Sequence, residues 1–248
     1  TANTGTGSFV LGYAPKPTFD RKQRILCSAA AIPGEWIVEA GIYASGATYN
    51  WVRGQLFDQK DENNPITFEE VNEQVNAAPP GCNGVIVLPH FSGSAAPYWN
   101  PLAKGMFFNL GLGTKRSELC RAVLEGIAGE IADNIGLIAE NVGEIDHVCV
   151  AGGLTRFPTY CQIMADNLQL PVLRRRNAEA TLMGCLMSAC VSLGIYPDYK
   201  TAYEAIVSGE TERFEPIAEN KAVYEKNRAL RRAVYDALNA AGVYELAE

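Results

Sequence analysis

Two glycine-rich turns carry residue types suited to holding a phosphorylated ligand. Near the start of the chain, Gly5, Thr6 and Gly7 separate two short stretches that favour β-strands. Glycine lacks a Cβ atom, so the turn can present several backbone N–H groups to phosphate oxygens at close range. The same residues also fit a simple hairpin in which the glycines only supply positive φ angles.

The second turn follows a short apolar run. Residues 148–151 predict a buried strand, Gly152 and Gly153 come directly after it, and Pro158 can begin a helix because its fixed φ suits the first turn. A strand, a double-glycine turn and a helix bring backbone N–H groups close to an anion. The pattern is also common as a plain connection, so the turn by itself leaves both interpretations open.

The pattern of apolar residues predicts the elements that position these turns. The hairpin at 2–13 is followed by predicted strands at 25–32, 36–39, 85–88, 106–110, 148–151 and 172–173. Helices are predicted at 42–56, 115–141, 178–193, 199–207 and 219–241, with a shorter one opened by a capping box at Thr67 and Glu70. This mixture favours an α/β fold, one domain over residues 1–248, with a mixed sheet flanked by helices.

Three helices carry further expectations. Thr114 is expected to cap helix 115–141, whose Gly126, Gly129 and Gly136 predict close packing of another element against it. In helix 178–193 the apolar residues, including the methionines at 183 and 187, are expected to fill the core. A small-residue patch at 45–47 opens helix 42–56, where a glycine is costly unless a backbone must approach closely.

Composition excludes several functions. The 248 residues are 48% hydrophobic and 20% charged, as in soluble globular proteins, and the net charge of −7 argues against nucleic acid as a partner. Seven cysteines without a CxxC pair are expected to be buried, reduced thiols of a cytoplasmic protein. With His90 and His147 as the only histidines, no metal site is expected, and no apolar run has membrane length.

Several stretches together resemble the FGGY family of carbohydrate kinases, within the actin-like ATPase superfamily. The segment GTGSF at 5–9 resembles the family's second phosphate loop. The segment FSGSAAPYWNPLAKG at 91–105 resembles the family loop that contains APYW, and GMFFNLGLGTKRSELCRAVLE at 105–125 resembles the family's C-terminal signature. The segment VAGGLTRFPTYCQIMADNLQLPV at 150–172 resembles the family's adenosine motif. The segment NAEATLMGCLMSA at 177–189 resembles the helix after that motif, and the segment 213–238 resembles the family's closing helix. The chain departs from the signature at Asn109, where relatives usually have glycine. The resemblance covers essentially the whole chain.

The resemblance implies an actin-like, ribonuclease H-like domain and a two-domain kinase that transfers the γ-phosphate of ATP, with Mg²⁺, to a hydroxyl of a sugar or polyol. It implies that this chain is the C-terminal, ATP-binding half, without the N-terminal domain. The general base is expected upstream of residue 1, as are most Mg²⁺ and substrate ligands. No catalytic residue is therefore assigned here, and the fragment alone is expected to be inactive.

The family's phosphate site maps onto five residues. By this resemblance, Gly5, Thr6 and Gly7 wrap the β- and γ-phosphates, with backbone N–H groups and the threonine hydroxyl as donors. Gly46 corresponds to a glycine next to the phosphates. Asn50, one helical turn later, corresponds to a polar residue that faces the nucleotide.

The adenosine and substrate sites map onto four more residues. Gly152 and Gly153 correspond to the glycines that lie against base and ribose. Phe157 stands where relatives often have Asn or Ser, so the resemblance implies an apolar contact with adenine. Phe9 corresponds to an aromatic residue that packs against the substrate's carbon chain in glycerol-kinase-like members.

The sequence leaves two questions open, namely which molecule accepts the phosphoryl group and whether the protein is an enzyme. The APYW spelling at 96–99 favours glycerol kinase, whereas 26–42 does not match it well, so a pentulose or another polyol stays open. A non-enzymatic, actin-like nucleotide-binding or assembly module is the second class considered. The loop at 91–105 and the closing helix favour the kinase. The expected partners are ATP or ADP, the sugar or polyol, the protein's own N-terminal domain and a possible second copy.

Overall fold

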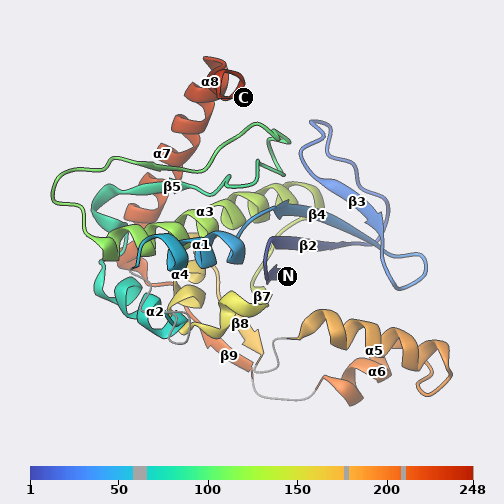
Figure 1. The fold of residues 1–248 in the computed structure, drawn as a ribbon. Helices are drawn as coiled ribbons and strands as arrows, with labels where there is room; N and C mark the ends of the chain where they lie inside the picture. Colours follow the sequence, from blue (N-terminus) through green and yellow to red (C-terminus); the bar gives the residue numbers. More distant parts are fainter. Residues whose placement is uncertain (58–65, 176–178, 208–210, 248) are drawn as a thin grey trace.

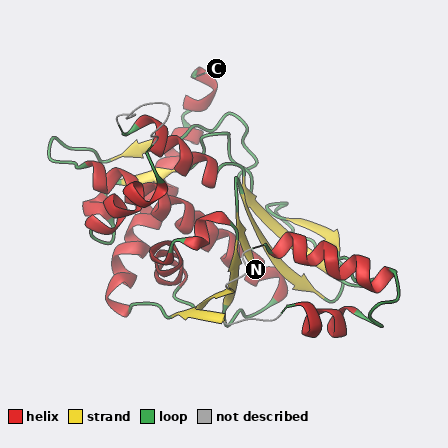
Figure 2. Ribbon diagram, turned by 60° about the horizontal axis from the view of Figure 1, so that its bottom comes forward, coloured by secondary structure: helices red, strands yellow, loops and turns green. Residues whose placement is uncertain are grey.

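A computed structural model describes residues 1–57, 66–175, 179–207 and 211–247. Its main sheet has the strand order β3-β4-β2-β1-β7-β8-β9 (Figures 1 and 2). The strands are β1 (Ala2–Thr4), β2 (Ser8–Ala14), β3 (Leu26–Ala29), β4 (Trp36–Ile42), β7 (Val148–Ala151), β8 (Val172–Arg175) and β9 (Thr211–Phe214). The sheet is mixed, because β7 runs parallel to both β1 and β8 while the other pairs are antiparallel. A separate ribbon pairs β5 (Ile86–Leu88) with β6 (Met106–Phe108).

Figure 2 shows most helices on one side of the sheet and a separate pair on the other. The helices are α1 (Gly46–Gln55), α2 (Phe68–Ala77), α3 (Arg116–Val142), α4 (Pro158–Leu168), α5 (Ala180–Ser192), α6 (Tyr199–Ile206), α7 (Lys221–Ala240) and α8 (Val243–Leu246). The pair set apart is α5 and α6 (Figure 1). The predicted mixed sheet flanked by helices is therefore present.

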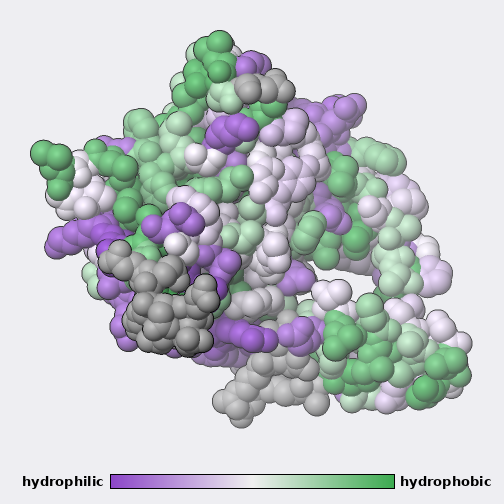
Figure 3. All heavy atoms as spheres, in the orientation of Figure 1, coloured by the Kyte–Doolittle hydropathy of each residue, from purple (hydrophilic) through white to green (hydrophobic). Residues whose placement is uncertain are grey.

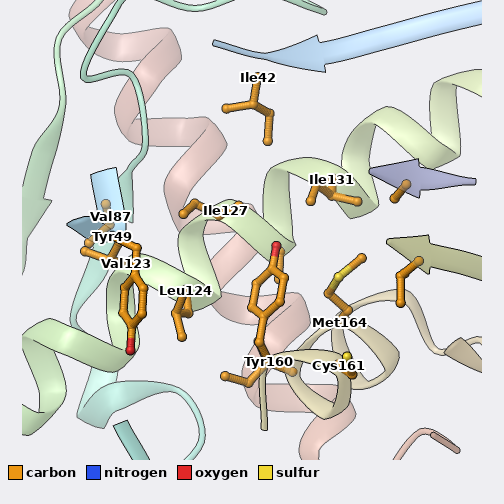
Figure 4. Close-up of a cluster of buried hydrophobic side chains, with 14 of the residues drawn as sticks. Ile42, Tyr49, Val87, Val123, Leu124, Ile127, Ile131, Tyr160, Cys161 and Met164 are labelled. Atoms are coloured by element: carbon orange, nitrogen blue, oxygen red, sulfur yellow. The ribbon is translucent and has the colours of Figure 1, made fainter. Parts of the chain in front are cut away.

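Helix α3 forms the centre of the core. Most of its residues are buried, because it packs on β2 and β4 and also contacts α2, α4, α7 and β5. Figure 4 shows Ile127 and Ile131 of α3 beside Tyr160 and Met164 of α4, with Ile42 of β4 above them. Val123, Ile127, Ile131 and Ile135, spaced four residues apart, are all buried along this helix. The core therefore ties the sheet, which carries the first glycine turn, to α4, which follows the second.

The glycines of α3 differ in their surroundings. A Cβ at Gly126 would lie 2.7 Å from the carbonyl oxygen of Val87, so the predicted close packing occurs against β5. At Gly129 it would lie 3.3 Å from Cγ of Arg228, on α7. At Gly136 no atom lies within 4 Å, so the close-packing prediction is wrong at that position.

Several local expectations need correction. Lys115, and not Thr114, is the N-cap of α3, and its N–H donates to Glu118 at 2.8 Å, whereas the hydroxyl of Thr114 accepts the N–H of Gly111. The predicted helix 42–56 begins only at Gly46, because β4 continues through Ile42. Strand β9 was not predicted. The capping box of α2 at Thr67 is confirmed.

The backbone conformation at position 109 explains why Asn109 can replace the glycine that is usual in the family signature. Its φ is +68°, in the left-handed region that favours glycine, and asparagine is among the few other residues that tolerate it. Its side-chain amide donates to the carbonyl oxygen of Gly84 at 3.0 Å, which adds a tie between β6 and the turn before β5. The substitution therefore keeps the backbone conformation and gains a hydrogen bond.

Helix α5 departs most from expectation. It is strongly apolar, yet none of its residues is buried, and Leu182 and Leu186 are 67% and 47% exposed. Met183 and Met187 are only partly buried, so their predicted role as core fillers is wrong in this structure. Figure 3 shows the apolar side chains of this region gathered at the lower right of the molecule. Within the described residues, α6 is the main contact of α5.

Two of the three glycines of α3 provide a test of the packing. We expect Gly126→Ala to destabilise the protein by about 1–3 kcal/mol, because the added methyl group must displace the backbone of Val87. Gly136→Ala is the matched control, and we expect it to stabilise by up to about 1 kcal/mol, since only helix propensity changes. Urea unfolding measures both. Equal effects of the two substitutions would contradict this packing.

The cysteines provide a second test. All seven are free, and Cys185 is exposed, which corrects the expectation that all are buried. Burial raises the pKa of the Cys120 and Cys161 thiols to about 12, so only about one in ten thousand is ionised at pH 8. We expect a disulfide reagent to modify Cys185 first and these two only after unfolding. Mass spectrometry of peptides, with Cys185→Ser as control, reads the order directly.

Candidate functional site

The first glycine turn is bound to the start of α1. The carbonyl oxygen of Thr6 accepts the N–H groups of Ser45 at 2.8 Å and Ala47 at 3.1 Å, and that of Gly5 accepts the N–H of Gly46 at 3.0 Å. The first N–H groups of a helix have no partner within the helix. Here the turn supplies those partners, so the hairpin sits on the positive end of the α1 dipole.

Glycine is required on both sides of this contact. A Cβ at Gly46 would lie only 2.4 Å from the carbonyl oxygen of Gly5. A Cβ at Gly7 would lie 2.7 Å from the carbonyl oxygen of Ile42 and 2.9 Å from that of Tyr43. Backbone atoms cannot move aside as a flexible side chain can. The close approach expected for the helical glycine at 46 is therefore confirmed.

The N–H groups of the turn itself remain available. In the described part of the chain, the amides of Gly5, Thr6 and Gly7 donate to no protein group. The side chain of Thr6 is exposed beside them. Adjacent amide donors next to a helix N-terminus favour an anion, so this turn suits a phosphate group better than a cation.

The second glycine turn abuts the first. Gly152 has φ +97°, and a Cβ there would lie 2.6 Å from the carbonyl oxygen of Thr4, the last residue of β1. The hydroxyl of Thr4 donates to the carbonyl oxygen of Ala151 at 3.2 Å. Since β1 and β7 are adjacent and parallel, both turns leave the same edge of the sheet. Two motifs predicted separately from the sequence thus meet in one place.

The remaining predicted residues surround these turns with different exposure. Gly153 is exposed, and a Cβ there would meet no atom within 4 Å, so protein packing does not explain its lack of a side chain. Asn50 is exposed on α1, one turn after Gly46. Phe157 is half-buried and packs partly against the core, immediately before α4. Phe9 is half exposed on β2, on the outer face of the sheet.

Sequence reasoning missed two side-chain contacts that support the turns. The hydroxyl of Ser8 donates to that of Ser45 at 2.7 Å, and both are buried beneath the first turn. The side-chain amide of Asn3 donates to Thr181 at 3.2 Å, which links β1 to the start of α5. A polar residue at an inward position of β2 was the available signal for Ser8. The contact with α5 had no signal in the sequence.

Helix α1 is fixed to the core by Tyr49. Its ring is buried, and its hydroxyl donates to the side chain of Asn72 on α2 at 2.8 Å. Burial raises the pKa of Tyr49, so the hydroxyl stays protonated and keeps donating. Helix α1, which binds the first turn, is therefore itself fixed to α2 by this hydrogen bond.

The described residues contain no group of three or more His, Cys, Asp or Glu side chains placed to hold a metal ion. No helix in that part of the chain is long and apolar enough to span a membrane. What the site presents is backbone N–H groups, a threonine hydroxyl and open glycine surfaces. Such a site can bind and orient an anion, and it holds no side chain suited to proton transfer.

Comparison with known proteins agrees with this geometry. Residues 1–193 match the FGGY family of carbohydrate kinases, C-terminal domain. The glycerol kinase of Haemophilus influenzae is 30% identical over 235 residues, which are 93% of this chain and 45% of that protein. The ligand-bound xylulose kinase of Lactobacillus acidophilus has a TM-score of 0.84 at 22% identity, over 96% of this chain and 47% of its own. For the Plasmodium falciparum glycerol kinase with ADP, the TM-score is 0.77 at 22% identity, over 96% and 46%.

The mixed sheet flanked by helices, with two glycine turns at one edge, is the actin-like ATPase fold expected from the sequence. More particularly, the chain belongs to the FGGY family of carbohydrate kinases and matches its C-terminal domain. It spans about half the length of the curated relatives it matches.

The contact between α1 and the first turn can be tested by substitution. We expect Gly46→Ala to destabilise the protein by about 1–3 kcal/mol, because its Cβ collides with the carbonyl oxygen of Gly5. Gly54→Ala, on the same helix, adds a Cβ that would meet no atom within 4 Å and serves as control. Thermal unfolding compares the two. An unchanged melting temperature for Gly46→Ala would refute the interlock.

Proposed function

We propose that this chain is the ATP-binding half of a two-domain carbohydrate kinase, which transfers the γ-phosphoryl group of ATP to a hydroxyl of a sugar or polyol. The observation that carries the proposal is the meeting of the two glycine turns at one sheet edge, with unused amide donors beside an open glycine surface. The family match and the ADP present in the Plasmodium glycerol kinase structure support it.

Each turn has a separate role in this proposal. The amides of Gly5, Thr6 and Gly7 and the Thr6 hydroxyl bind the β- and γ-phosphates and stabilise charge as the phosphoryl group moves. Gly46 brings the positive end of α1 beneath that turn. Asn50 faces the nucleotide from the next turn of the same helix.

The adenosine lies against the second turn. Gly153 leaves room for base and ribose because a side chain there would enter open space, while Gly152 lets the turn pack against the backbone of Thr4 beside them. Phe157 contributes an apolar contact to adenine from the start of α4. Phe9 contacts the carbon chain of the acceptor.

Mg²⁺ and the general base belong to the rest of the protein in this proposal. The described residues supply no suitable group of metal ligands, and the glycine turns hold no proton acceptor for a substrate hydroxyl. Because the family match is to the C-terminal domain, we place both in an N-terminal domain of the full-length protein. Domain closure would bring the two halves together and exclude water from the reaction.

The surface of α5 supports docking of that domain. A helix with exposed Leu182 and Leu186 lacks the cover that apolar side chains usually have in a folded protein (Figure 3). Its N-terminal turn contacts Asn3 on β1, so it lies close to the proposed phosphate site. We propose that the N-terminal domain covers this face. The alternative is that a second copy of the protein covers this face of α5 in a homodimer. We also propose that the protein is cytoplasmic.

A non-enzymatic, actin-like assembly module remains the second candidate. It would bind ATP through the same turns without phosphorylating a sugar. We expect the full-length protein to phosphorylate a member of a panel of polyols and ketoses, and the 248-residue chain alone to show no such turnover. ATP binding without any acceptor-dependent ADP release by the full-length protein would favour the assembly module.

The open position at Gly153 gives a direct test of nucleotide binding. We expect Gly153→Val to weaken ATP binding at least tenfold without lowering the melting temperature, since its side chain enters space that the protein leaves empty. Gly113→Val, in the loop before α3, also meets no atom within 4 Å and is the control. Calorimetry on the full-length protein measures both. Equal ATP affinities of the two variants would contradict the placement.

A further inference from the structure

A cavity lies beside the first glycine turn, on the outer face of the sheet. Its volume is about 250 Å³, and its walls include Phe9, Tyr43 and Trp99 from β2, the β4–α1 turn and the loop 89–105. These three aromatic side chains are 49%, 50% and 38% exposed. Half-exposed rings that converge on one cavity from three segments indicate a place for a ligand.

The register of the sheet brings a carboxylate into this cavity. Phe9 pairs with Gly41 across β2 and β4, and the absence of a side chain at Gly41 lets the ring lie over it. Glu39 lies two residues along β4 on the same face, about 7 Å away. Its cross-strand neighbours are Leu11 and Leu26, so the carboxylate stands between apolar side chains.

Glu39 has no internal partner. Within the ranges that the structure describes, its carboxylate makes no hydrogen bond or ion pair. The side chain is partly exposed, so its carboxylate oxygens are free to accept hydrogen bonds from a ligand in the cavity. Hydroxyl groups of a ligand in the cavity would supply the missing donors.

The aromatic wall is held in position by the protein. The indole N–H of Trp99 donates to the carbonyl oxygen of Arg24 at 3.0 Å. Arg24 in turn pairs with Asp20 at 2.7 Å and with Glu140 of α3 at 2.7 Å. The Trp99 ring is therefore fixed at the cavity edge, where a flat apolar face suits the C–H groups of a polyhydroxylated molecule.

The cavity also adjoins the proposed phosphate site. Tyr43 is part of the cavity wall, and its carbonyl oxygen lies 2.9 Å from where a Cβ of Gly7 would be. Phe9 follows the glycine turn by two residues. The acceptor of a phosphoryl group must lie next to the γ-phosphate, and this cavity has that position.

We propose that this cavity is the acceptor subsite and that Glu39 determines its specificity, favouring neutral polyhydroxylated acceptors longer than glycerol and rejecting sugar acids. The proposal rests on the proposed kinase function and extends it beyond the Phe9 contact. Phe9 holds the end of the acceptor near the phosphate, and Glu39 accepts hydroxyl hydrogen bonds about 7 Å further along. A carboxylate on the acceptor would be repelled by that of Glu39.

The test uses the full-length protein and a panel of glycerol, erythritol, xylitol, D-xylulose, D-ribulose and gluconate. We expect a neutral acceptor longer than glycerol to have the highest kcat/KM. Glu39→Gln should raise the KM for that acceptor about tenfold with kcat within twofold, and should lower the KM for gluconate. Tyr43→Leu, which removes one wall, should also raise the KM for the neutral acceptor. Calorimetry without ATP should show the same order of affinities.

Glu73→Gln, an exposed carboxylate on α2 outside the cavity, is the matched control and should change no constant. Melting temperatures of all variants exclude a folding defect. A preference for glycerol or gluconate, or an unchanged acceptor KM and affinity in Glu39→Gln, would overturn the specificity role while leaving the kinase function standing. Absence of turnover with every acceptor would instead overturn the proposed kinase function, and the subsite with it.

Discussion

The carbonyl oxygens of Gly5 and Thr6 accept the first N–H groups of α1, and the geometry of the candidate site depends on this contact. This contact occupies the N–H groups at the start of α1, which would otherwise be free to donate to a ligand. The donors left over are those of the hairpin, which stands one layer further from the helix. The positive end of the dipole thus acts through the turn, and the backbone of the turn sets the shape of the candidate anion site.

The core beneath the site makes this arrangement rigid. Helix α3 is buried on nearly all sides, and it contacts β2, which follows the first turn, as well as α4, which follows the second. Its carboxylates add polar ties, since buried Glu125 accepts from Arg121 at 2.6 Å and from the N–H of Gly81. A single helix therefore sets the distance between the two turns of the candidate site.

Sequence alone predicted those parts of the site that glycine encodes. The cost of glycine within a helix pointed to a close approach at residue 46, and the approach is that of the Gly5 carbonyl oxygen. Likewise, the turns at Gly7 and Gly152 are glycine because backbone atoms lie within 3 Å of any added Cβ. Only glycine fits where backbone atoms leave no space for a Cβ atom, so such positions can be predicted from the sequence without knowing the fold.

Contacts between distant segments could not be predicted in the same way. Strand β9 has the sequence TERF, which lacks an apolar run, and it forms only because β8 offers an edge. The apolar pattern of α5 predicts burial but not which surface provides it, and here none in the described chain does. Glu39 escaped notice because a lone carboxylate in a strand is unremarkable until Leu11 and Leu26 are seen beside it.

The pairing of β1 with β7 has a consequence for how the protein is made. The hydrogen bond from Thr4 to Ala151 joins residues 147 positions apart. The loop between them must close before the two glycine turns can meet, and such long-range closure is slow relative to local helix formation. During synthesis, the earliest residues of this chain must therefore wait for the strand near residue 150 to leave the ribosome. The candidate site can therefore form only after both ends of this long loop have come together.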